Sequence, residues 1–89
     1  MINRVKLALR LTTTAYDDDV QGLIDAAYAD LGIAGIYNAS EGDPIIDRAV
    51  ITYCRLNFGS PDDYDRLKAS YDEQKSQLQM ATGYGMVDA

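Results

Sequence analysis

This 89-residue chain contains no histidine. Its main candidates for chemistry are therefore a single cysteine, Cys54, and fourteen acidic side chains. Ser–His–Asp and Cys–His catalytic arrangements both need an imidazole base, so neither can form. The same composition excludes a zinc site of the Cys/His kind, and the glycines do not follow the spacing of a phosphate-binding loop. We therefore expect no catalytic residue, no metal ligand and no cofactor.

The acidic run Asp17 to Asp19 is the strongest candidate for a cation site, since carboxylates bind Ca²⁺ and Mg²⁺. A calcium loop also needs spaced oxygen ligands, a central Gly and a distal Glu, and the run lacks this pattern. Acids are equally typical of the first turn of a helix, where they complement the positive end of the helix dipole. We interpret this run, and Asp62 with Asp63, as helix starts rather than as ligands or acid–base pairs.

Apolar residues recur at helical spacing in two segments of the N-terminal half. Residues 2–11 predict a short helix that the threonine run 12–14 ends, because β-branched residues disfavour helix. A second helix is expected to begin at Asp17 and to stop at Gly32. Its apolar stripe consists of Val20, Leu23, Ile24, Ala27, Tyr28 and Leu31.

A third helix is expected after a loop rich in turn-forming residues over 35–42. Asp43 has the chemistry of an N-cap, and Pro44 suits the first helical position. The segment that follows is apolar around most of its circumference, and Gly59 is expected to end it. Such a helix is expected at the centre of the domain or against a neighbour.

A fourth helix is expected to begin with Ser60 as its N-cap and Pro61 at its first position. An ion pair between Asp62 and Arg66 would support its first turn. Its apolar positions form only a thin seam, which predicts a helix on the outside of the bundle.

These patterns predict an all-α fold, a small bundle of about four helices over residues 1–80 with an extended, flexible tail over 81–89. The seam of the fourth helix and the apolar residues of the tail are the expected protein interface, because exposed aromatic and apolar side chains suit docking. These interface residues are Tyr64, Leu67, Tyr71, Tyr84, Met86 and Val87.

The net charge is −6, and the acidity is concentrated in residues 17–47, which hold eight acids and no base. A surface of this sign repels phosphate, which argues against tight binding of nucleic acid. The chain has no apolar run long enough for a transmembrane helix and no signal-peptide pattern. We expect a soluble protein made in a reducing cytoplasm.

Two parts of the chain resemble a known family, the small head–tail connector proteins of long-tailed bacteriophages, often labelled DNA-packaging proteins. The resemblance extends over about residues 2–80 and consists of helix starts and apolar positions. The segments that carry it are residues 4–10, 17–20, 23–27, 43–53 and 57–59.

The resemblance implies a structural protein without enzymatic activity that forms a ring of about twelve copies beneath the portal. Its partners would be further copies of itself, the portal protein, and a head-closure, stopper or tail protein; alone in solution it could be a monomer. It would act at the head–tail junction of the virion after assembly in the host cytoplasm, with no membrane. DNA would pass through the ring without specific binding, along acids that are expected to be Asp17, Asp18, Asp19, Asp25 and Asp30.

Two other functions remain open from the sequence. One is a small helical protein-binding module or regulator without enzymatic activity. A regulator that binds DNA would need a basic recognition helix, and the chain has none. The other is an enzyme subunit with catalytic acids, which is disfavoured because the paired acids occupy positions typical of helix starts.

Overall fold

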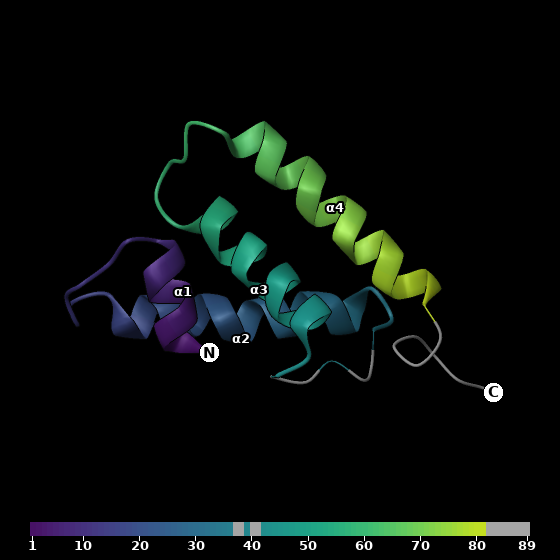
Figure 1. Ribbon diagram of the computed structural model, residues 1–89, viewed down its shortest axis with the longest axis horizontal. Coiled ribbons are helices and arrows are strands. Elements are labelled where there is room, and N and C mark those ends of the chain that lie inside the picture. Colours follow the sequence, from purple (N-terminus) through teal and green to yellow (C-terminus); the bar gives the residue numbers. More distant parts are fainter. Residues whose placement is uncertain (37–38, 40–41, 82–89) are drawn as a thin grey trace.

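The computed structural model describes residues 1–36, 39 and 42–81, and within these ranges the chain forms four helices and no strand. The helices are α1 (Ile2–Ala8), α2 (Asp17–Ile33), α3 (Pro44–Asn57) and α4 (Tyr64–Met80). Figure 1 shows α3 in the middle, with α2 crossing behind it and α4 running along its outer side. Helix α3 contacts each of the other three, so the all-α bundle and the central third helix are confirmed.

The core is made by apolar side chains from all four helices. In α2 the predicted stripe is buried at Val20, Ile24, Ala27 and Leu31, whereas Leu23 and Tyr28 are only partly covered. Burial of each large aliphatic side chain contributes about 1.5–3 kcal/mol. The buried apolar residues are Val5, Val20, Ile24, Ala27, Leu31, Ile36, Ile46, Ala49, Val50, Cys54, Leu56, Leu67, Tyr71 and Leu78.

Helix α2 ends later than the sequence predicted. Gly32 lies inside the helix, and Gly35 takes the left-handed conformation with φ +90° that ends it. The Ile36 N–H donates to the Leu31 carbonyl at 2.9 Å, and the Gly35 N–H donates to the Gly32 carbonyl at 3.0 Å. This pairing is the Schellman motif. Ile36 is buried, so the motif is fixed where it delivers that side chain to the core.

Helix α1 also ends in this motif, three residues before the predicted end at Leu11. The Leu11 N–H donates to the Lys6 carbonyl at 2.9 Å, and the Arg10 N–H donates to the Leu7 carbonyl at 3.1 Å. Arg10 occupies the left-handed position with φ 60°, where glycine is usual. The threonine run therefore follows the helix end rather than causing it.

The start of α3 is as predicted, since Pro44 is its first residue and Asp43 is its N-cap. An Asp43 carboxylate oxygen accepts from the N–H groups of Ile45 at 3.0 Å and Ile46 at 3.4 Å. The chain leaves α3 through Phe58, and Gly59 has φ +66°, which confirms the predicted stop.

The predicted start of α4 is wrong by about three residues. The helix begins at Tyr64 with Asp63 as its N-cap residue, so Ser60 and Pro61 precede it in the connecting segment. Arg66 accordingly pairs with Asp63 at 2.5 Å and not with Asp62. Because the helix begins at Tyr64, Asp62 lies outside the helical backbone, whereas the N-cap Asp63 is placed three residues before Arg66 on the first turn.

Candidate interaction surfaces

The residues that could support catalysis are dispersed or buried. Cys54 is fully buried, and burial raises the pKa of its thiol to about 12, so it is not a nucleophile at neutral pH. Across residues 1–36, 39 and 42–81, no three His, Cys, Asp or Glu side chains gather closely enough to hold a metal ion. Nor does any helix in those ranges have the length and apolar character to span a membrane.

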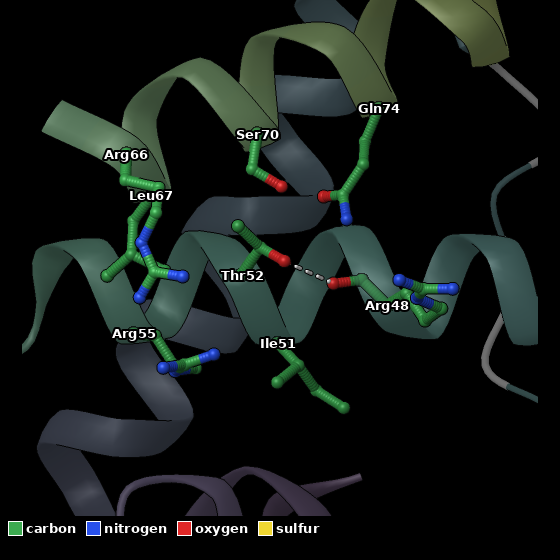
Figure 2. Close-up of a pocket in the computed structure, with 8 residues that line it drawn as sticks. All are labelled: Arg48, Ile51, Thr52, Arg55, Arg66, Leu67, Ser70 and Gln74. Carbon is green, nitrogen blue, oxygen red and sulfur yellow. Dashed lines mark hydrogen bonds between the residues drawn. The ribbon is translucent and has the colours of Figure 1, made fainter. Parts of the chain in front are cut away.

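A basic pocket of about 350 Å³ lies between α3 and α4. Arg48, Thr52 and Arg55 line it from α3 at positions i, i+4 and i+7. Arg66 and Ser70 face them from α4, and Figure 2 shows the arginine side chains at the two ends of the pocket with the polar groups between them. We call the set Arg48, Arg55 and Arg66 the arginine pocket.

The arginine pocket holds most of the cationic charge that the fold leaves unused. Five basic side chains form ion pairs with acids of the same chain: Arg4, Lys6, Arg66, Lys68 and Lys75. Among the residues that the structure describes, Arg10, Arg48 and Arg55 have no ion pair. Two of these three line the same pocket. Such a pocket favours an anion, and paired N–H donors of arginine suit a carboxylate or a phosphate.

The five acids that we expected along the channel do not share one environment. Asp17 forms an ion pair with Lys6 at 2.7 Å, and Asp30 forms one with Lys75 at 3.3 Å. Asp18, Asp19 and Asp25 are exposed and lack an ion pair within the described part of the chain. The first turn of α2 thus carries its acids near the helix start, as predicted, although no side chain makes an N-cap hydrogen bond to it.

Asp30 joins α2 to α4 through side chains. The Tyr71 hydroxyl donates to its carboxylate at 2.6 Å, and the Lys75 ammonium donates at 3.3 Å. Burial acts to raise the pKa of Asp30, but these two partners outweigh it and lower the pKa overall. Burial, and then the Asp30 carboxylate, raise the pKa of Tyr71. Asp30 is therefore a structural anchor for α4 more than a free surface charge.

The structure describes three of the six expected interface residues. Tyr64 is half-exposed at the start of α4, whereas Leu67 and Tyr71 are buried against the rest of the chain. The ring of Tyr71 meets that of Tyr53 in an edge-on contact, with ring centres 5.4 Å apart. The thin apolar seam of α4 is thus largely buried by packing on α3. Tyr84, Met86 and Val87 lie outside the described residues.

A second surface feature, which the sequence did not reveal, is an apolar groove of about 790 Å³ beside the start of α2. Tyr16 and Phe58 meet there in an edge-on contact, with ring centres 5.8 Å apart. Leu11 and Leu23 extend the apolar lining, and Asp18 and Asp19 stand among it. The partial exposure of Leu23 comes from its place in this groove. The signal that could have found it is the offset of Leu23 from the centre of the α2 stripe.

Asp47 is the one charged residue that is buried among those described. One of its oxygens accepts from Arg4 of α1 at 2.5 Å, and the other accepts from the Gly42 N–H at 3.2 Å. It ties three parts of the chain together and has no free surface, so it is structural. Its partner Arg4 lies 43 residues away, which no local pattern could indicate.

Comparison with known proteins identifies the family of this chain. A family model described as "Phage connector protein" matches residues 1–85, and so confirms the resemblance that the helix starts and apolar positions predicted. Neither the curated proteins nor the solved structures contain a match to this chain.

Proposed function

Because this chain belongs to the phage connector protein family, a structural family whose members associate with other components of the virion, we propose that it forms a ring of about twelve copies at the head–tail junction, below the portal. The observation that carries the proposal is the family match over nearly the whole length of the chain. Two features fit a structural role: the acidic run forms the first turn of α2, and the single thiol of the chain is buried.

The ring would let the genome pass without holding it. Asp19 is exposed and not neutralised by an ion pair within the described residues, so it is the acid best suited to face DNA, whereas the equally exposed Asp18 and Asp25 are available to a neighbouring subunit. Like charge removes the gain from counterion release that drives binding of proteins to DNA. Asp17 and Asp30, by contrast, are partly neutralised by lysines and would add little to such a lining.

The two sides of the ring would contact different partners, the portal protein on one side and a head-closure, stopper or tail protein on the other. Tyr84, Met86 and Val87 supply apolar side chains for one of these contacts. Tyr64 adds a half-exposed ring beside the start of α4. Leu67 and Tyr71 would support the contact indirectly, because they hold α4 on the bundle.

The test is deletion of the gene from the phage, followed by examination of the particles. We expect filled heads without attached tails, and the chain should be present in purified wild-type virions by mass spectrometry. In light scattering, the purified chain should form a large complex when the portal is added. Removal of residues 83–89 should preserve helicity in circular dichroism and weaken portal attachment. A chain that is absent from virions and stays monomeric with the portal would overturn the proposal.

A further inference from the structure

The arginine pocket lies on the side of α3 that faces away from the core. Ile46, Val50 and Cys54 occupy the buried side of that helix, and Arg48 and Arg55 project from the opposite side. In Figure 2 the ribbon of α2 passes behind α3, and the three arginines of the pocket are exposed. The pocket is therefore open to a partner outside the chain.

The outward side of α2 has the complementary charge. Its buried residues, Val20, Ile24 and Leu31 among them, face the core, and Asp18 and Asp25 lie on the opposite side of the helix. Gly22 lies between the two aspartates, and no side chain occupies the space where its Cβ would be. This side of α2 carries negative charge and also permits close approach of another helix.

The two surfaces match in spacing as well as in sign. Arg48 and Arg55 are seven residues apart on α3, and Asp18 and Asp25 are seven residues apart on α2. Seven residues of α-helix span about 10.5 Å, so two helices that pack side by side can form both charge pairs at once. Thr52 lies between the two arginines as Gly22 lies between the two aspartates.

We infer that the arginine pocket of one copy receives the outward side of α2 from the next copy, with Arg48 and Arg55 paired to Asp18 and Asp25. The contact is heterologous, because it joins two different surfaces on opposite sides of the subunit, and such contacts generate rings when the rotation closes. The inference rests on the proposed ring and names the surfaces that build it.

A second copy fits the pocket better than DNA does. Duplex DNA carries one charge per about 1.7 Å of its axis, so contact with three arginines brings many phosphates to the surface. Acids surround the pocket: Asp63 pairs with Arg66, and Glu73 lines the adjoining hollow with Arg48. These acids repel a long polyanion that extends over them, whereas a single carboxylate of another protein can reach an arginine without lying next to them.

Charge exchange tests the inference with the full chain. We expect Arg48→Glu/Arg55→Glu to weaken self-association at least tenfold in sedimentation velocity at high concentration and low salt, and Asp18→Arg/Asp25→Arg to do the same. A 1:1 mixture of the two double variants should associate again, because each then offers the surface that the other lacks. The variant with all four substitutions should associate by itself.

The control variant Arg10→Glu/Lys68→Glu changes the net charge by the same amount as Arg48→Glu/Arg55→Glu and should associate as the wild type does. Circular dichroism should show that each variant is folded, since all the substituted side chains are exposed. Double variants that associate as the wild type does, or a mixture that does not recover, would overturn the inference. A loss of binding to a 20-base-pair duplex in Arg48→Glu/Arg55→Glu would assign the pocket to phosphate instead. None of these results bears on the presence of the chain in virions, which tests the proposed function separately.

Discussion

The ion pair between Arg4 and Asp47 offers the sharpest test of how the fold is held. The Asp47 side chain is 2% exposed, and the Arg4 side chain is 56% exposed. Removal of Arg4 leaves a buried carboxylate whose one donor among the described residues is the Gly42 N–H. A hydrogen bond to a charged group contributes about 1.5–3 kcal/mol, and the half-exposed arginine places the value near the middle of that range. We expect Arg4→Ala to lower the free energy of unfolding by about 2 kcal/mol.

Asp47→Ala should cost more, because it loses the bond from Arg4 and leaves the Gly42 N–H without its acceptor. We expect about 3 kcal/mol, with about 1 kcal/mol from the second bond. The double variant should also cost about 3 kcal/mol, since Arg4 has nothing further to lose. The coupling energy of the cycle is then about 2 kcal/mol. A domain of this length has a total stability of about 4–13 kcal/mol, so the effect is large.

Urea unfolding followed by circular dichroism at 222 nm gives the free energy of unfolding of all four proteins. In thermal unfolding, a loss of about 2 kcal/mol corresponds to a fall of about 8–16 °C in Tm. Arg48→Ala is the matched control, because that arginine is exposed and has no ion pair within the described residues, and it should change stability by less than about 0.5 kcal/mol. A cost below about 0.5 kcal/mol for Arg4→Ala, or additive costs in the cycle, would refute the reasoning.

Three more predictions follow from the fold. Val50→Ala should cost about 2 kcal/mol in urea unfolding, and Leu23→Ala, in the half-open groove, should cost about half as much; equal costs would contradict the burial difference. Arg10→Gly should raise Tm by a few degrees, a gain of about 0.5 kcal/mol, because it relieves the left-handed arginine at some cost in unfolded-chain entropy; a lower Tm would contradict this. The lowered pKa of Asp30 contributes stability that is present above pH 3.8 and is lost as pH falls through the folded pKa. Tyr71→Phe should therefore destabilise at pH 6 in urea unfolding and lose much of that effect at pH 2.5; an unchanged difference would contradict it.

The sequence predicts those features of this fold that depend on neighbouring residues. Asp43 and Pro44 define a helix start because the cap and the proline act on the next turn alone. The choice between Gly32 and Gly35 as the end of α2 is different, since both glycines are locally suitable. It is decided by the burial of Ile36, a tertiary contact that helical spacing does not contain.

The interaction surfaces are harder to predict for the same reason. Arg48 and Arg55 are visible as one polar side of a helix, but their union with Arg66 depends on how α4 is placed along α3. Leu67 and Tyr71 likewise read as a surface seam until the neighbouring helix is in place to cover them.

The burial of Cys54 has a consequence for the life of the particle outside the cell. A virion leaves a reducing cytoplasm and persists in an oxidising medium, where exposed thiols form disulfides or are oxidised further. This chain carries a single cysteine, fully enclosed and with a thiol pKa of about 12. A ring of such subunits would have no thiol that an oxidant or a neighbouring subunit can reach. Its contacts would then gain no disulfide cross-link after assembly, and oxidation of sulfur would fall on exposed methionines such as Met80 instead.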